Sequence, residues 1–142
     1  MSQTIKHLIF IFGTLKQDFP NFNQNMGELV DANCKTRLPY PLYLVGERYS
    51  PWLINEPRNG SMVSGELYRV TEQQLIGMDR LERTGHSDGY RRETISIETD
   101  AQRILDCFCY LKPPEQLMEA EIKLGPLSAY SLQHAAMYQS RH

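Results

Sequence analysis

The apolar residues of this chain are gathered into short runs, and this distribution restricts the folds that the chain can adopt. No uninterrupted run of hydrophobic residues is longer than positions 8–12, which is the length of a single β-strand. A membrane-spanning helix needs roughly 20 consecutive apolar residues. We therefore expect a protein built from several short strands, with no segment that crosses a membrane.

Turn-forming residues separate the segments that have the composition of strands. Residues 6–12 have the continuous apolar pattern of a buried strand, and residues 90–99 alternate with a period of two. Between residues 18 and 26, Asn, Pro and Phe indicate a loop with at most a short helix. The expected strand segments are residues 6–12, 28–30, 40–45, 51–55, 62–70, 90–99 and 104–112.

One helix is clearly indicated, at residues 71–83. Thr71 and Gln74 form a capping box at its start, and Gly85 is expected to end it. Residues 115–123 are compatible with a second helix, and the rest of the C-terminal tail is expected to be irregular. Many short strands with one or two helices predict an α+β fold with a curled or barrel-like sheet. We expect one domain over residues 1–142, with its core at about 6–112.

The composition limits the classes of partner. Hydrophobic residues make up 41% and charged residues 23% of the chain, as in ordinary globular proteins, and the net charge of −2 provides no basic surface for nucleic acid. The N-terminus lacks the features of a secretion signal, so we expect a cytoplasmic protein. No Cys or His spacing of a metal site is present. These residues are Cys34, Cys107 and Cys109, expected to be packed thiols, and His7, His86, His134 and His142.

Glu82 is the most informative polar residue of the expected helix. On a helical wheel its side chain points roughly 20° from the centre of the apolar stripe, whereas Asp79 lies nearer the edge of that stripe. A buried carboxylate is costly unless a partner or a function compensates. Glu82 is therefore either a proton-transferring group in a cleft or half of a structural ion pair. The stripe consists of Leu75, Ile76, Met78 and Leu81, and the candidate ion-pair partners are Arg80, Arg83, Arg91 and Arg92.

The turn at residues 13–16 (Gly-Thr-Leu-Lys) is a second candidate site. Glycine permits close approach of a ligand to the main chain, and successive N–H groups can bind an anion. The sequence lacks the second glycine and the Gly-Lys-Ser/Thr ending of a P-loop. An ordinary turn and a substrate-binding turn are both compatible with this pattern. Three aromatic residues suit either a cavity wall or a core: Trp52, Tyr90 and Tyr110.

Several motifs occur together in order along the chain. Residues 9–16, followed by Pro20-Asn21, resemble the opening Tyr-Gly-Thr-Leu-Lys…Pro-Asn signature of the gamma-glutamyl cyclotransferase-like superfamily. Later segments are similar to its gamma-glutamylamine cyclotransferase (AIG2-like) branch, including the Leu-Asp-x-x-Glu helix and the strand with a tyrosine that follows it. The similar segments are residues 40–42, 46–47, 51–53, 63–70, 78–82 and 90–92, and the whole resemblance covers roughly 7–112.

This resemblance implies a small mixed β-barrel with flanking helices and a cavity at one end. It implies an enzyme that converts a small γ-glutamyl amide into 5-oxoproline and a free amine, without metal or organic cofactor, as a monomer or weak homodimer. The catalytic glutamate of the family corresponds to Glu82. The substrate-binding turn corresponds to Phe12, Gly13, Thr14 and Leu15.

Three features differ from the family pattern. Phe12 stands where the family usually has tyrosine, the segment at residues 83–89 is longer than usual, and the C-terminal tail does not match the pattern clearly. These differences bear on the leaving amine more than on the core chemistry. Two alternatives stay open: cyclisation of other γ-glutamyl compounds, such as γ-glutamyl amino acids, and a non-catalytic module that binds a small metabolite. An inward-facing Glu82 favours catalysis, because a binding pocket has less reason to bury an acid.

Overall fold

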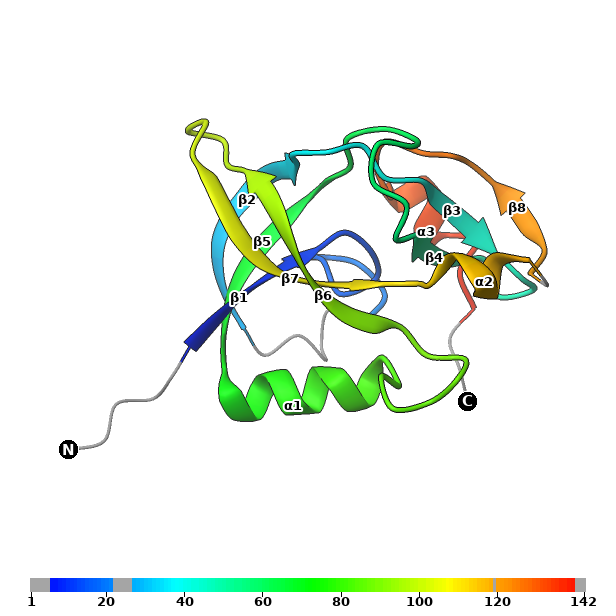
Figure 1. The fold of residues 1–142 in the computed structure, drawn as a ribbon, viewed down its shortest axis with the longest axis horizontal. Helices are drawn as coiled ribbons and strands as arrows, with labels where there is room; N and C mark the ends of the chain where they lie inside the picture. Colours follow the sequence, from blue (N-terminus) through cyan, green and yellow to red (C-terminus); the bar gives the residue numbers. More distant parts are fainter. Residues whose placement is uncertain (1–5, 22–26, 119, 140–142) are drawn as a thin grey trace.

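A computed structural model describes residues 6–21, 27–118 and 120–139, and a closed barrel of five strands forms its centre (Figure 1). Four strand pairings are antiparallel, and the barrel closes where β7 meets β1 in parallel at Ile9 and Phe108. The mixed barrel expected from the sequence is therefore confirmed. In order around the barrel, the strands are β1 (Lys6–Ile11), β5 (Ser64–Thr71), β2 (Glu28–Thr36), β6 (Arg91–Glu98) and β7 (Ile104–Leu111).

A smaller sheet of three strands lies beside the barrel, away from the longest helix (Figure 1). Its central strand, β3 (Leu42–Val45), pairs antiparallel with β4 (Ser50–Leu53) on one side and with β8 (Ile122–Leu124) on the other. An isolated parallel bridge between Ile54 and Lys112 connects this sheet to the end of β7. The three helices are α1 (Glu72–Leu81), α2 (Pro114–Leu117) and α3 (Leu132–Ala135).

Strand β1 is buried on both faces, which accounts for its continuous apolar sequence. Ile9 and Ile11 belong to a core cluster with Leu75 and Met78 of α1, whereas Phe10 belongs to the cluster inside the barrel. Successive side chains of a strand point to opposite faces, so one strand serves both cores. Helix α1 is thus packed against β1, together with Tyr68 and Val70 of β5 and Tyr110 of β7.

Helix α1 begins as the sequence predicts. The Gln74 N–H donates to the Thr71 hydroxyl (3.1 Å), and the Thr71 N–H donates to the Gln74 side-chain oxygen (2.8 Å). Leu75 and Met78 are buried as expected. Ile76, which was also expected in the apolar stripe, is 44% exposed. That part of the prediction is wrong because the helix contacts the barrel along a narrow row of residues spaced by three and four positions.

The C-terminal end of α1 differs from the prediction. Arg83, and not Gly85, adopts the left-handed backbone conformation, with φ of 58°. The N–H of Arg83 bonds to the carbonyl of Arg80, and the N–H of Thr84 bonds to that of Asp79 (both 3.1 Å). This is the hydrogen-bond pattern of a Schellman motif, which most often carries glycine at the left-handed position. The helix therefore ends before Gly85 is reached.

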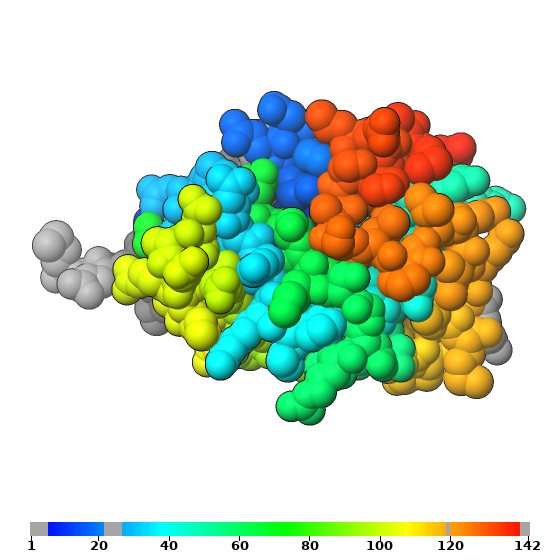
Figure 2. All heavy atoms as spheres, turned by 90° about the horizontal axis from the view of Figure 1, so that it is seen from above, coloured from blue at the N-terminus to red at the C-terminus, as the bar shows by residue number. Residues whose placement is uncertain are grey.

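The C-terminal segment is more ordered than expected. Helix α2 is a single turn instead of a helix over residues 115–123, and the expected irregular tail contains β8 and α3. Tyr130 is fully buried, and its carbonyl accepts a hydrogen bond from the Lys16 ammonium group (2.6 Å). Figure 2 shows the C-terminal residues packed beside the N-terminal turn. Long-range pairing of this kind leaves no local sequence signal, which explains the error. Of the loop expected at 18–26, residues 22–26 lie outside the described part.

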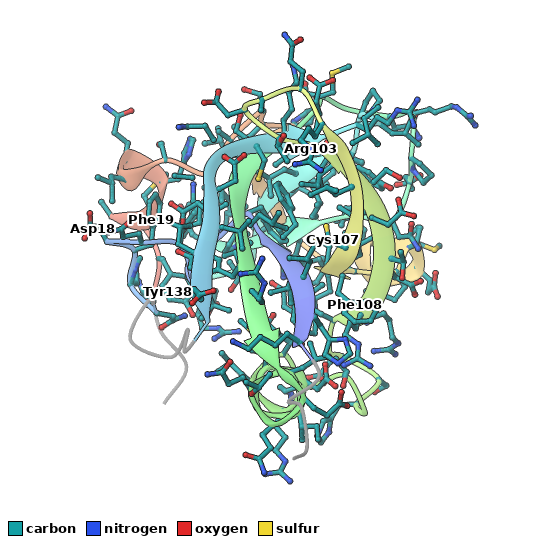
Figure 3. All side chains as sticks on the ribbon, turned by 90° about the vertical axis from the view of Figure 1, so that its left-hand side faces the viewer. Asp18, Phe19, Arg103, Cys107, Phe108 and Tyr138 are labelled. Atoms are coloured by element: carbon teal, nitrogen blue, oxygen red, sulfur yellow. The ribbon has the colours of Figure 1, made fainter. Side chains whose placement is uncertain are left out.

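The three cysteines are buried and unpaired, as expected. Burial raises the pKa of the Cys34 and Cys107 thiols to about 12 and that of Cys109 well above its usual value. Cys107 and Cys109 share the face of β7 that points into the barrel, and Phe108 between them belongs to the other face (Figure 3). Within the described ranges, no helix is long and apolar enough to cross a membrane.

We expect Thr71→Ala to lower the free energy of unfolding by about 1 kcal/mol, because the helix loses its N-cap acceptor. Thr71→Ser keeps the hydroxyl and is the matched control. Urea denaturation followed by circular dichroism measures both variants. An alanine variant as stable as the wild type would show that the capping box contributes nothing.

Candidate active site

A cavity of about 1220 Å³ opens where the end of β1, the end of α1 and the β3–β4 hairpin meet. Cavities that bind small ligands usually measure roughly 300–1,000 Å³, so this one is large enough for a metabolite composed of two joined parts. Every site residue predicted from the sequence lines it. These residues are Phe12, Gly13, Thr14, Leu15, Trp52, Glu82, Tyr90 and Tyr110.

Glu82 is the C-cap residue of α1. It continues the row of Leu75 and Met78 with spacings of three and four residues, so it lies on the side of the helix that faces the barrel. Its N–H donates to the Met78 carbonyl (2.9 Å), and its own carbonyl accepts from the Tyr90 N–H (3.0 Å). The half-buried side chain is thereby held at the cavity, on the inward side that the helical wheel indicates.

Most of the arginines considered as ion-pair partners of Glu82 have other partners. Neither Arg91 nor Arg92 lines the cavity. The contacts are Arg83 with the Asp88 carboxylate (3.2 Å), Arg92 with the Asp79 carboxylate (2.7 Å), and Arg91 with the carbonyls of His86 and Gly89 (3.0 Å each).

Tyr110 connects the cavity to a hydrogen-bonded network behind it. Its hydroxyl donates to one oxygen of Asp79 (2.7 Å), whose other oxygen accepts from Arg92. Burial raises the pKa of Tyr110, and the hydrogen bond to Asp79 and the charge of Glu82 raise it further. Tyr110 therefore stays protonated at neutral pH. Asp79 is the other carboxylate of this helix that was considered for the site. Its two oxygens accept the hydrogen bonds of this network, and it does not line the cavity.

The turn after β1 is fixed by hydrogen bonds on both sides. The Lys16 N–H closes it onto the Gly13 carbonyl (3.1 Å), and the Asn21 side chain donates to the Thr14 hydroxyl (2.8 Å). A Cβ atom on Gly13 would lie 3.0 Å from Cγ of Pro51, so glycine allows the turn to approach the β3–β4 hairpin closely. Within the described part of the chain, the N–H groups of Gly13 and Thr14 have no protein acceptor. Adjacent N–H groups of this kind can bind an anion.

Aromatic rings form another wall of the cavity. The Tyr90 hydroxyl donates to the Pro51 carbonyl (2.8 Å), which fixes the ring against the β3–β4 hairpin. The ammonium group of Lys112 lies 4.2 Å from the centre of the Trp52 ring and 4.6 Å from that of Tyr90. Both rings and the lysine line the cavity, so this wall combines apolar surface with a fixed positive charge.

Sequence reasoning did not single out several residues that line the cavity, among them Lys112, Asn21 and Tyr138. Lys112 stands at the end of a strand, directly before two prolines, and its neighbours in the sequence do not indicate its partners. Asn21 belongs to the signature motif, and its amide also donates to the Tyr138 hydroxyl (3.3 Å). Figure 3 shows Tyr138 on the same side of the molecule as Phe19, from the N-terminal segment. No local pattern identifies Tyr138.

The histidines that the structure describes lie outside the cavity, and His142 is not among the described residues. The same part of the chain contains no group of three or more His, Cys, Asp or Glu side chains that could hold a metal ion. Glu82, the backbone of the 13–15 turn and the aromatic wall are the parts of the cavity lining that the sequence indicates.

Comparisons with known proteins agree with the sequence motifs. The model of the family described as "Gamma-glutamyl cyclotransferase, AIG2-like" matches residues 9–129. Gamma-glutamylaminecyclotransferase C of Danio rerio is 36% identical over 97 residues, which are 65% of this chain and 62% of that protein. Gamma-glutamylaminecyclotransferase of Homo sapiens is 32% identical over 127 residues, which cover 76% of this chain and 82% of that protein. The crystal structure of an AIG2-like protein from Mus musculus superimposes with a TM-score of 0.78 and 27% identity, over 96% of this chain and 97% of that one.

We expect Gly89→Ala to disturb the connection that follows Glu82. A Cβ atom at residue 89 would lie 1.7 Å from the Arg83 carbonyl oxygen, so the backbone must move, and we expect a loss of about 1–3 kcal/mol of stability. Gly85→Ala is the matched control in the same loop, because a Cβ atom there meets nothing within 4 Å. Thermal unfolding of both variants is the measurement. Equal melting temperatures would contradict the close approach of residues 83 and 89.

Proposed function

This chain belongs to the gamma-glutamyl cyclotransferase, AIG2-like family, and we propose that it is a gamma-glutamylamine cyclotransferase. The proposed reaction converts a γ-glutamyl amide into 5-oxoproline and a free amine. The observation that carries the proposal is the meeting, in one cavity, of the inward-facing carboxylate of Glu82 and the main-chain turn at residues 13–15. A carboxylate and a set of N–H donors are the two kinds of group that this reaction requires.

In the proposed reaction, the substrate supplies its own nucleophile. Its α-amine attacks its γ-carbonyl carbon, a C–N bond forms to close a five-membered lactam, and the original amide C–N bond breaks. The enzyme has to fold the glutamyl chain so that these atoms meet, and such intramolecular attack reaches very high effective molarities. The raised pKa values of the buried thiols fit this mechanism, because protonated cysteines are poor nucleophiles.

We assign the proton transfers to Glu82. Its carboxylate accepts a proton from the α-ammonium group, which frees the lone pair for attack. It then returns a proton to the departing nitrogen as the amide bond breaks, and the second proton of the attacking nitrogen is lost to water as the lactam forms. The half-buried position of Glu82 beside the protonated Tyr110 suits a group that alternates between base and acid.

The turn at residues 13–15 is the proposed cradle for the glutamyl part. The N–H groups of Gly13 and Thr14 would bind the α-carboxylate or the oxyanion that develops on the γ-carbonyl oxygen. Phe12 and Leu15 border the same part of the cavity with buried apolar side chains. The substrate atoms outside the cradle would contact the aromatic side chains of Trp52, Tyr90 and Tyr110. Each step uses groups of the substrate and of the protein, so the proposal requires no cofactor.

We further propose that the protein acts in the cytoplasm on small molecules, as a monomer or weak homodimer. Three buried, unpaired thiols suit a reducing compartment. Size-exclusion chromatography with light scattering would measure the oligomeric state.

The function is tested by incubating the protein with γ-glutamyl-ε-lysine, a γ-glutamyl amino acid or glutathione, and measuring 5-oxoproline. We expect product from γ-glutamyl-ε-lysine. Product from a γ-glutamyl amino acid alone would indicate the alternative substrate class. No product from any of the three would favour a module that only binds a metabolite.

Glu82→Gln should fold normally and lower turnover by about 10²–10⁴-fold, because the amide cannot accept the α-ammonium proton. Glu93→Gln, on the exposed face of β6, is the control for loss of a carboxylate elsewhere. Initial rates of 5-oxoproline release and thermal melts compare the two variants. Wild-type turnover in Glu82→Gln would remove this residue from the mechanism.

Gly13→Val should raise the KM about tenfold, because the branched side chain meets Pro51 and pushes the turn away from the substrate. Gly85→Val, where a Cβ atom meets nothing within 4 Å, should leave the KM unchanged. Steady-state kinetics with γ-glutamyl-ε-lysine give both constants. An unchanged KM in Gly13→Val would count against the cradle.

A further inference from the structure

The loop at residues 83–90, which follows Glu82, forms part of the cavity wall. Ser87, Asp88 and Tyr90 of this loop line the cavity, although Ser87 and Asp88 are themselves largely exposed to solvent. The part of the wall that they form therefore depends on contacts that hold the loop against the rest of the protein. One of those contacts comes from Lys112, and two more come from Gln116, which is hydrogen-bonded to Lys112.

Lys112 is a buried lysine, only 4% exposed, at the end of the strand that carries Tyr110. Its ammonium group donates to the carbonyl of Asp88 (2.6 Å) and to the side-chain oxygen of Gln116 (2.9 Å). The same ammonium group faces the rings of Trp52 and Tyr90. One charged group thus contacts β4, the 83–90 loop and α2, and these four residues (Trp52, Asp88, Tyr90 and Gln116) all line the cavity.

Gln116 extends this arrangement. Its amide nitrogen donates to the carbonyls of Ser87 (3.0 Å) and Gly89 (2.9 Å), while its oxygen accepts from Lys112. Lys112 and Gln116 together therefore bind three successive carbonyls of the loop, at residues 87, 88 and 89. A lysine held by hydrogen bonds and two aromatic faces loses much of its conformational freedom. The same contacts restrict the movement of its partners.

The contacts of Lys112 described above differ from those that fix the turn at residues 13–15. The 13–15 turn is fixed by Lys16 and Asn21, and the Glu82 N–H is bonded within α1. A cavity of about 1220 Å³ also exceeds what a glutamyl group alone occupies. The part bordered by Trp52, Asp88 and Gln116 is consequently available for the amine that leaves.

We propose that Lys112 is a positioning residue that shapes the leaving-amine part of the cavity by holding the 83–90 loop and the Trp52–Tyr90 wall in place. This inference rests on the proposed function for its substrate class. Lys112 is expected to affect the recognition of the leaving amine. It is not expected to affect the proton transfers of Glu82.

The test compares two substrates that differ only in the leaving amine, γ-glutamyl-ε-lysine and γ-glutamyl methylamide. Lys112→Met keeps the linear side chain beside the rings and removes the ammonium group. We expect its KM for γ-glutamyl-ε-lysine to rise about tenfold, with the methylamide KM and both kcat values changed by less than about twofold. Gln116→Ala, which leaves Lys112 and the buried core in place, should change the same ratio in the same direction.

Lys35→Met is the matched control, because Lys35 lies on β2 away from this cavity, with an exposed side chain near Glu98 (3.7 Å). It should change neither KM. An equal loss of activity on both substrates in Lys112→Met would reveal a role in general stability only and would overturn the proposal. An unchanged KM ratio in both Lys112→Met and Gln116→Ala would overturn it as well.

Trp52 provides a second readout that does not depend on turnover, because it is the only tryptophan of the chain and lies beside the Lys112 ammonium group. We expect Lys112→Met to shift the emission of Trp52 and to increase its quenching by acrylamide, whereas Lys35→Met should not.

If the wild type makes no 5-oxoproline, the proposed function fails, and titration of Trp52 fluorescence with the two amides still tests Lys112. Weaker binding of γ-glutamyl-ε-lysine alone in Lys112→Met supports the inference, and equal affinities of variant and wild type overturn it.

Discussion

The contact between α1 and β1 determines where the functional groups of this protein meet. Leu75 and Met78 pack against Ile9 and Ile11, and this packing fixes the helix along the outside of the barrel. The end of the helix is thereby placed next to the end of the strand. Glu82 and the turn that begins at residue 13 come together because they lie within two residues of the ends of these two packed elements. The core contact thus positions both the proposed acid and the proposed cradle.

The parts of this arrangement that could be read from the sequence depend on local, periodic signals. The capping box of Thr71 and Gln74, the continuous apolar run of β1 and the helical position of Glu82 all reflect interactions within a few residues. Such interactions leave a pattern in the sequence, because each backbone conformation has its own side-chain period. The family motifs then joined these separate observations into one site.

The parts that escaped prediction depend on contacts between distant segments. Arg83 adopts a conformation usually left to glycine, which becomes understandable once its pairing with Asp88 and the hydrogen bonds of the loop are known. Strand β8 has three residues, and only its pairing with β3 makes it a strand. Lys112 has the sequence context of an ordinary strand end, and its partners lie on three other elements. No window of neighbouring residues contains this information.

The barrel is closed by its first and last strands, through the pairing of Ile9 with Phe108, and Tyr138 reaches the cavity from still later in the chain. During synthesis the strand–turn unit around Gly13 leaves the ribosome long before these partners exist. A nascent chain of a hundred residues would therefore have the acid and the turn without the enclosing wall. The complete cavity can form only after these late residues have been synthesised.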